Sequence, residues 1–272
     1  MLAHQRREEL LILAKTYPHP STKYRETTCV AALTRAGEMR RLFPVPFRFL
    51  VGETRFQKWE WISAVVSKAR NDHRPESHKI DVDSIQKLDE VVPTANDWRE
   101  RLDWARPHLV PSFDELEERR QNTGSTLGFV RPTRLLGLDI TPEKHPDWTD
   151  AERENLSREV MFDPEVAGRR LPLRKLPFAF HFRYECQTAN GSREHRHLLT
   201  DWEVGALYWN CVRSDGDNWQ APFRARLEGD FASKDLWFLL GTQHRFPDQW
   251  LIISFIYPPR AKPNPQLALS FE

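Results

Sequence analysis

Three side chains in the last third of the chain could together carry out hydrolytic chemistry. His195 lies six residues before Asp201 and eight residues before Glu203. Carboxylate oxygens are the ligands that Mg²⁺ and Mn²⁺ prefer, and an imidazole can bind a metal or transfer a proton. These residues are therefore the catalytic candidates for a metal-dependent nuclease or another phosphodiester hydrolase. No motif of the sequence requires a cofactor. A divalent metal ion is the cofactor that such a hydrolytic site would bind.

The acidic pair has a structural interpretation as well. Thr200-Asp201-Trp202-Glu203 fits a capping box, in which the Thr200 side chain and the acid three residues later satisfy each other's backbone amides at the start of a helix. Acidic residues in a first turn are also favoured by the helix dipole. Because capping explains both the residue types and their spacing, we favour it and predict a helix over roughly 201–213.

Cysteine and histidine residues of the same region form no recognisable zinc site. Cys186, His195, His197 and Cys211 contain no Cys-x-x-Cys knuckle, and their spacing matches no standard finger.

The three cysteines of the chain are an odd number and lie far apart, which favours a reducing compartment over a disulfide framework. We find no signal-peptide pattern and no membrane-length apolar run, and we expect a cytoplasmic protein without a membrane partner.

Basic and aromatic residues alternate in four short stretches near the N-terminus. The stretches are Lys23-Tyr24-Arg25, Arg40-Arg41-Leu42-Phe43, Phe47-Arg48-Phe49 and Arg55-Phe56-Gln57-Lys58-Trp59. Arginine binds phosphates through its planar fork, and aromatic rings stack on unpaired bases. A β-sheet surface with both suits single-stranded or distorted nucleic acid. We predict that the contacts come from Lys23, Arg25, Arg41, Arg48, Arg55 and Lys58. An ordinary β-module with an arginine-rich polar face would show the same pattern.

The net charge of +1 hides an uneven distribution. Residues 1–80 carry 15 Lys and Arg against 8 Asp and Glu, residues 81–165 carry 11 against 20, and residues 166–272 carry 14 against 11. A basic module can face phosphates although the whole chain is near neutral. Basic and acidic segments that pack together in one fold would give the same distribution.

The sequence contains no P-loop, dinucleotide-binding or nucleophile-elbow motif. Nucleotide hydrolysis by a P-loop and α/β-hydrolase chemistry are therefore disfavoured.

Hydrophobic periodicity predicts an α+β protein of three parts: a basic β-rich module resembling a small barrel over 1–82, an acidic helical middle over 83–170, and a C-terminal α/β portion over 171–272. The predicted strands of the first part cover 9–16, 27–34, 38–43 and 56–68. Capping boxes place helix starts near Ser112 and Thr149, and apolar periodicity predicts a third helix from Asn96 to about Ala105. The last part should contain a strand near 176–186, a His-rich turn, the helix near 201–213 and a closing β-hairpin.

Several motifs resemble those of a family of uncharacterised bacterial proteins. They are spread over nearly the whole chain and include Lys15-Thr16-Tyr17-Pro18, Arg41-Leu42-Phe43-Pro44-Val45-Pro46-Phe47-Arg48, Arg74-Pro75-Glu76-Ser77, Asp201-Trp202-Glu203, Gly241-Thr242 and Tyr257-Pro258-Pro259. The family's pattern has a second cysteine before the acidic pair. In this chain Cys186 has no clear cysteine partner. The resemblance implies a single co-evolved unit and supplies no activity.

We predict a nucleic-acid-binding protein that acts as a subunit of a bacterial defence or nucleic-acid-processing assembly and has protein partners there. One alternative is the hydrolase centred on His195, Asp201 and Glu203. The other is a protein-interaction scaffold that uses the abundant tryptophans. Salt-dependent binding indicates the first function and metal-dependent turnover the second, whereas a scaffold shows neither.

Overall fold

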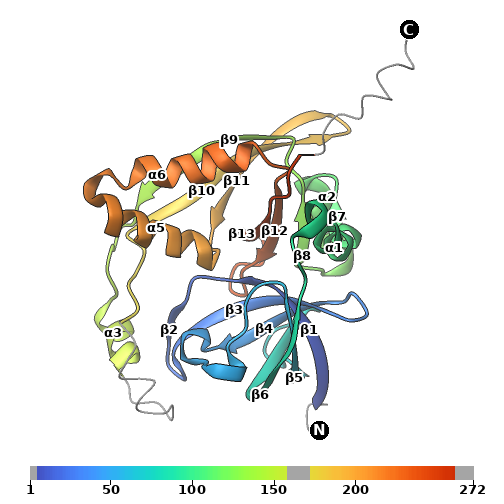
Figure 1. Cartoon of the computed structure of the whole chain (residues 1–272), viewed down its shortest axis with the longest axis vertical. Helices are drawn as coiled ribbons and strands as arrows, with labels where there is room; N and C mark the ends of the chain where they lie inside the picture. The colour runs from blue at the N-terminus through green and yellow to red at the C-terminus, as the bar shows by residue number, and fades with distance from the viewer. Residues whose placement is uncertain (1–4, 158–171, 261–272) are drawn as a thin grey trace.

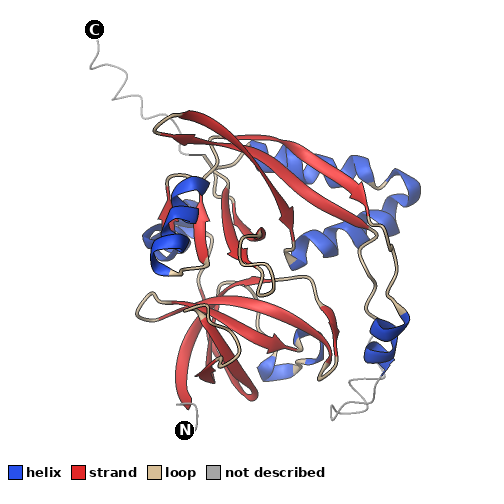
Figure 2. Cartoon of the chain, turned by 180° about the vertical axis from the view of Figure 1, so that it is seen from behind, coloured by secondary structure: helices blue, strands red, loops and turns tan. Residues whose placement is uncertain are grey.

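The computed structural model describes residues 5–157 and 172–260, which form two β-sheets and a set of helices (Figure 1). This mixed architecture confirms the predicted α+β class. The barrel lies at one end of the molecule, the second sheet lies against it, and helices α5 and α6 lie at the other end (Figures 1 and 2). None of the described helices is long and apolar enough to span a bilayer.

Five strands of the N-terminal part close into the predicted barrel. They are β1 (Gln5–Lys15), β3 (Arg25–Thr34), β4 (Met39–Val45), β5 (Glu60–Lys68) and β6 (Ser77–Val91). Their order is β1-β5-β6-β4-β3, and β3 pairs again with β1. β4 and β6 run parallel, and the other neighbours are antiparallel. In chain order the strands therefore follow 1-2-3-5-4, the Greek-key arrangement of an OB-fold.

Both faces of the barrel strands are apolar, because the barrel has a filled interior and a covered exterior. Leu10 and Ile12 of β1 belong to the interior cluster, whereas Leu11 and Leu13 belong to the cluster between the barrel and the second sheet. A bulge between Ile12 and Ala14 bends β1, which then pairs with both β3 and β5. The loop between β1 and β3 carries the short strand β2 (His19–Ser21), and two 3₁₀ turns follow β4, η1 (Phe47–Phe49) and η2 (Gly52–Thr54).

The second sheet has seven strands in the order β7-β8-β12-β13-β11-β10-β9. They are β7 (Leu109–Val110), β8 (Leu127–Val130), β9 (Arg134–Pro142), β10 (Phe178–Thr188), β11 (Gly191–Leu199), β12 (Trp237–Thr242) and β13 (Trp250–Ile256). Its outer face packs on α5 (Trp202–Asp215), α6 (Gln220–Arg224) and the π-helical turn η5 (Ala225–Asp230). On its inner face Leu127, Phe129, Trp237 and Leu239 pack against the barrel.

The helices of the middle part begin within one residue of the predicted starts Asn96, Ser112 and Thr149. They are α1 (Ala95–Ala105), η3 (Arg106–His108), α2 (Phe113–Thr123) and α3 (Asp150–Ser157). Ser112 Oγ accepts from Glu115 N at 3.2 Å at the start of α2. Before α3, Thr149 N donates to Glu152 Oε2 at 2.8 Å, and Glu152 N donates to Thr149 Oγ1 at 3.3 Å. Each pair satisfies amides that the first helical turn leaves without partners.

The predicted His-rich turn is wrong. His195 and His197 lie within β11, which pairs antiparallel with β10 in a hairpin that turns at Ala189-Asn190. Gly191 directly follows this two-residue turn and has a φ of 106°, a left-handed backbone conformation that favours glycine. The predicted closing hairpin is confirmed as β12 and β13. The polar strand β6 was not predicted from the sequence. It runs continuously through residue 82, at which the predicted first part ends.

Two side chains of the helical layer bind the main chain of Leu138 on the free edge of β9. Leu138 N donates to Glu228 Oε1 at 2.7 Å, and Arg224 Nη1 donates to Leu138 O at 2.8 Å. Arg224 and Glu228 also form an ion pair with each other at 3.0 Å. Edge groups that would otherwise invite another strand are therefore bonded within the chain.

Candidate nucleic-acid interface

Asp201 caps helix α5. Its Oδ1 accepts from Glu203 N at 2.6 Å and from Val204 N at 3.3 Å, and its side chain is fully buried. Thr200 donates its hydroxyl to Ile252 O at 3.4 Å instead. The predicted capping box of Thr200 and Glu203 is therefore wrong in its residues: Asp201 is the N-cap of α5, and the Glu203 carboxylate lies beside Lys58.

Lys58 joins the acidic pair to the barrel. Its Nζ lies 3.4 Å from Asp201 Oδ2 and 3.0 Å from Glu203 Oε2. Burial disfavours the charge of Lys58, but the two carboxylates outweigh burial and raise its pKa. Nearby, Lys15 Nζ lies 4.0 Å from the centre of the Phe47 ring, and burial lowers the pKa of Lys15 to about 8 against the opposing charge of Glu203. The carboxylates thus hold a buried lysine.

His195 lies away from the acidic pair. It faces the same side of the sheet as Tyr184, its strand partner, and its ring centre lies 5.0 Å from that of Phe113. The strand from His195 to Leu199 alone spans about 13 Å before α5 begins. Over 5–157 and 172–260 no group of three or more His, Cys, Asp or Glu residues could hold a metal ion. The structure therefore does not bring the three catalytic candidates together.

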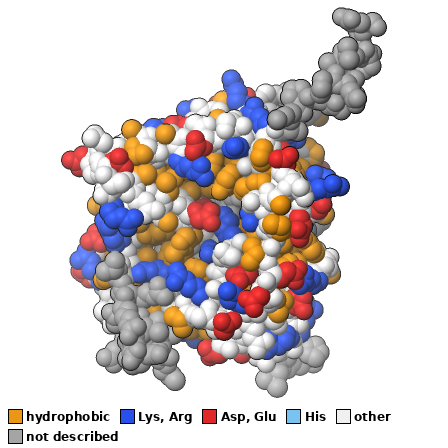
Figure 3. Space-filling model, in the orientation of Figure 1, with side chains coloured by type: hydrophobic (Ala, Val, Ile, Leu, Met, Phe, Trp, Pro, Cys, Tyr) orange, Lys and Arg blue, Asp and Glu red, His pale blue; other side chains and the backbone are white. Residues whose placement is uncertain are grey.

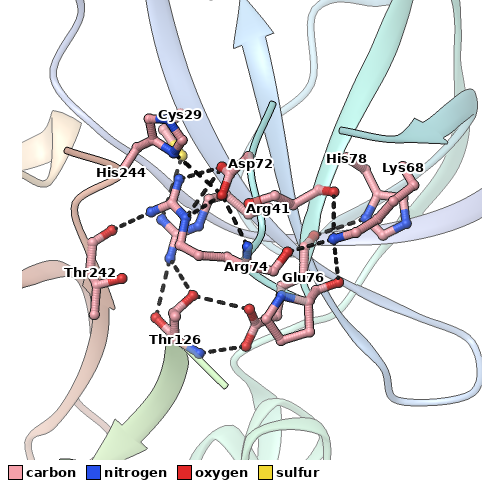
Figure 4. Close-up of polar contacts among 12 residues, drawn as sticks. Cys29, Arg41, Lys68, Asp72, Arg74, Glu76, His78, Thr126, Thr242 and His244 are labelled. Carbon is pink, nitrogen blue, oxygen red and sulfur yellow. Dashed lines mark hydrogen bonds and ion pairs between the residues drawn. The ribbon is translucent and has the colours of Figure 1, made fainter. Parts of the chain in front are cut away.

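Arg41 belongs to a buried polar network between the barrel and the second sheet, which Figure 4 shows. Arg41 Nη2 donates to Thr126 O at 3.1 Å. Glu76, from the loop between β5 and β6, accepts from Thr126 N at 2.7 Å and from Thr126 Oγ1 at 3.0 Å. Arg74 donates to Thr242 O at 2.6 Å. The Arg74-Pro75-Glu76-Ser77 motif thus fastens a barrel loop to β8 and β12.

Asp72 orients Arg74 within this network. The Asp72 carboxylate accepts from Nε and Nη2 of Arg74 at 2.9 and 2.6 Å. Burial alone would raise the pKa of Asp72, but the hydrogen bonds and charge of Arg74 outweigh burial and hold that pKa well below its usual range. The guanidinium is thereby fixed in the position from which it reaches the carbonyl of Thr242.

Tyr17 forms a second link between the barrel and α5. Its backbone N donates to Thr200 O at 2.7 Å, and its hydroxyl accepts from Trp209 Nε1 at 2.9 Å and donates to Arg174 O at 2.7 Å. The tyrosine ring lies so close to Gly205 that a Cβ there would be 2.2 Å from it. The Lys15-Thr16-Tyr17-Pro18 motif therefore meets the helix that Asp201-Trp202-Glu203 begins.

Beside this link, two neighbouring hollows of about 520 and 190 Å³ share Pro172 and Leu173 in their walls. We call the pair the junction groove and define it by the arginine and aromatic residues Tyr17, Arg25, Arg48, Phe49, Trp148, Arg153, Arg174, Trp202 and Trp209. Figure 3 shows Lys, Arg and hydrophobic side chains gathered on this side of the molecule, between α5 and the barrel.

Cations lie over aromatic rings along the junction groove. The guanidinium of Arg174 lies 3.4 Å from the centre of the Trp209 ring, and that of Arg25 lies 5.6 Å from the centre of Phe49. Lys175 lies 5.5 Å from the centre of Trp148. A guanidinium stacked on a ring still presents its N–H donors around its edge. The groove therefore combines phosphate-binding edges with rings on which bases can stack.

The six predicted phosphate-binding residues are distributed over several environments. Arg41 and Lys58 are committed to the contacts between barrel and sheet described above. Arg25 donates to Leu156 O at 2.8 Å, and Arg48 forms an ion pair with Glu26 at 2.9 Å; both line the junction groove. The remaining two are the exposed residues Lys23 and Arg55. The sequence analysis missed Trp148, Arg174 and Trp209, which no local pattern links to the barrel.

Comparisons with known proteins give two family matches. Residues 6–107 match the Domain of unknown function (DUF8758), and residues 109–271 match the Domain of unknown function (DUF8757). No curated protein matches the sequence. Among solved structures, the chain is similar to one titled "Structure and Conformational Change of a Replication Protein A Heterotrimer Bound to ssDNA", at 11% identity over 98% of this chain and 68% of that chain, with a TM-score of 0.27. Because its family model covers more than half of the sequence, the chain belongs to the Domain of unknown function (DUF8757) family.

Proposed function

We propose that the protein binds single-stranded nucleic acid in the junction groove. The barrel has the OB arrangement, which binds oligonucleotides and oligosaccharides through one strand face and the adjoining loops. Proteins of this kind combine a positively charged groove for the backbone with aromatic rings for the bases. The junction groove has both features, because four arginines line it against the two carboxylates of Glu26 and Asp147. It also includes the loop between β1 and β3.

The usual strand face of such a barrel is closed to ligands here. That face belongs to the second and third barrel strands, β3 and β4. Ala31, Leu33 and Met39 on these strands pack in one cluster with Leu127 and Phe129 of the second sheet. A nucleic acid would therefore have to bind at the loops beside the covered face, where the junction groove lies.

The observation that carries the proposal is that Arg174 is stacked on the Trp209 ring, at 3.4 Å from its centre, and that Arg25 lies within cation–π range of Phe49 in the same groove. These arginines offer phosphate contacts, and Trp148 and Trp202 add aromatic surface. Lys23 and Arg55, both exposed, extend the proposed contacts beyond the groove. The predicted bacterial assembly, its protein partners and the cytoplasmic location stay predictions.

The double variant Arg25→Gln/Arg174→Gln tests the proposal. We expect its affinity for labelled mixed-sequence single strands to fall by about tenfold or more, because charge-assisted contacts are lost. The slope of log K against log salt should also flatten by about 0.7 for each lost phosphate contact. Fluorescence anisotropy over a series of salt concentrations measures both quantities, with DNA and RNA strands and with a duplex.

Arg35→Gln is the matched control, because Arg35 lies 3.6 Å over the Trp61 ring outside the groove and pairs with Glu9 and Glu90. Its affinity and salt slope should equal those of the unmodified protein. Circular dichroism should show native folding for all variants. If a folded double variant binds as tightly and with the same salt slope as the unmodified protein, the groove is not the binding site.

A further inference from the structure

A separate hollow of about 650 Å³ lies between the loop that joins β8 to β9, the segment after η5 and the end of β13. None of its lining residues lines the junction groove. Its volume falls in the range of small-molecule sites, about 300–1,000 Å³. The hollow is therefore large enough for a ligand of nucleotide size.

Four cationic side chains from these three segments line the hollow: Arg131, Arg134, Lys234 and Arg260. Asp235 is the one carboxylate among the described lining residues. Arg131 Nε lies 2.6 Å from Asp235 Oδ1, and Arg134 Nη2 lies 3.0 Å from Glu185 Oε1 outside the hollow. With both carboxylates counted the set keeps an excess of positive charge, which favours an anionic ligand.

The three arginines of the hollow are held in place by hydrogen bonds or ion pairs. Arg260 donates from Nη2 to Ala232 O at 2.7 Å and from Nε to Lys234 O at 3.2 Å. The Lys234 amino group has no hydrogen bond or ion pair within the described part of the chain. A positioned arginine fork beside an uncommitted ammonium suits the oxygens of a phosphate group.

The floor of the hollow is apolar. Phe231 and Leu236 are buried there, and Pro132 and Leu135 also line the wall. Ligand sites commonly combine such an apolar lining with a few convergent polar groups. We propose that this hollow binds a nucleoside phosphate, with the cations on the phosphate and the apolar floor beneath the nucleoside. The phosphate could belong to a free nucleotide or to the 5′ end of a nucleic acid strand.

Titration calorimetry of the full chain with AMP tests the site. We expect one-to-one binding, with adenosine giving no heat because the phosphate is absent. The double variant Arg131→Gln/Lys234→Gln should bind AMP about tenfold more weakly or worse. Lys234→Gln alone should also weaken binding, and it removes no internal contact of the described residues.

Arg226→Gln is the matched control, because Arg226 lies 5.4 Å from the Phe231 ring centre, pairs with Asp230 and does not line the hollow. It should bind AMP as the unmodified protein does. Absence of heat with AMP, together with equal affinity for 5′-phosphorylated and 5′-hydroxyl oligonucleotides, would overturn the proposal. So would AMP binding that the double variant retains in full.

The two sources of phosphate give different results. If the ligand is a strand end, a 5′-phosphate should strengthen oligonucleotide binding to the unmodified protein and not to Arg131→Gln/Lys234→Gln. If the ligand is a free nucleotide, AMP binds and the 5′-phosphate has no effect. The Arg25→Gln/Arg174→Gln variant should bind AMP normally, so failure of the junction groove and failure of this site are distinguishable.

Discussion

Asp201 satisfies two structural requirements with one side chain. One carboxylate oxygen caps α5, and the other faces the Lys58 amino group of the barrel. A buried ammonium without a partner is strongly destabilising, so the carboxylate is as necessary to the lysine as to the helix. The residue types that suggested a metal site are those that this buried contact needs.

Replacing Asp201 by alanine should lower the free energy of unfolding by about 2–4 kcal/mol, because the cap is lost and Lys58 keeps only Glu203 as its carboxylate partner. Asp201→Asn should cost less, since asparagine also caps helices well. Thr200→Ala should cost less than about 1 kcal/mol. Urea denaturation measures all three. Stoichiometric Mg²⁺ binding that disappears in Asp201→Asn would contradict the structural role.

His197 makes stability depend on pH. Burial lowers the pKa of His197 from 6.5 to about 4, and Tyr184 Oη lies 3.1 Å from its Nδ1. The unfolded chain therefore binds more protons below pH 6.5, and stability is lost as the pH falls from about 6.5 to about 4. This group contributes about 3 kcal/mol of that loss. In His197→Gln, unfolding measured over this range should show a flatter pH dependence; an equally steep one would contradict the assignment.

At the scale of elements, the sequence predicts best where one physical rule dominates. Alternation identifies β10, and capping boxes locate α2 and α3, because each depends on neighbouring residues alone. Strand β6 escaped assignment because its outward positions are charged and few of its residues are apolar. The predicted His-rich turn is wrong because most residues of β11 are polar and only partly buried, as they are in a loop.

The candidate site is harder to predict than the elements that carry it. Arg41 looks like a surface residue in its basic stretch, but its strand is covered on both faces and the side chain is buried. Trp148, Arg174 and Trp209 lie in three segments with no shared local pattern. Their meeting with Tyr17 depends on how two sheets pack, which periodicity does not specify.

At the scale of the whole molecule, the two matched regions share the apolar cluster that lies between them. Apolar residues of the barrel and of the second sheet form a single cluster. Polar contacts flank it on both sides, with Glu76 and Arg74 at one and Lys58 and Tyr17 at the other. The boundary between the regions is therefore buried as a core is, and differs from the more polar contacts typical of loosely joined domains.

Separating the chain at residue 108 should leave neither part stable as a monomer, because each would expose its side of this apolar cluster. Co-expression of the two parts should restore a soluble complex. Calorimetry of the intact chain should show one unfolding transition. Two well-separated transitions, or a soluble monomeric 1–107 fragment with native circular dichroism, would contradict this expectation.

The covered edge of β9 limits how other proteins can bind. Arg224 and Glu228 occupy the main-chain groups of Leu138, and the opposite edge strand, β7, has only two residues. Recruitment by adding a strand to a sheet needs unbonded main-chain groups along an edge, and at Leu138 these groups are already bonded within the chain. A protein that binds the sheet edge at Leu138 must therefore recognise side chains, so its specificity there would be encoded in residue identity and would be open to change by single substitutions.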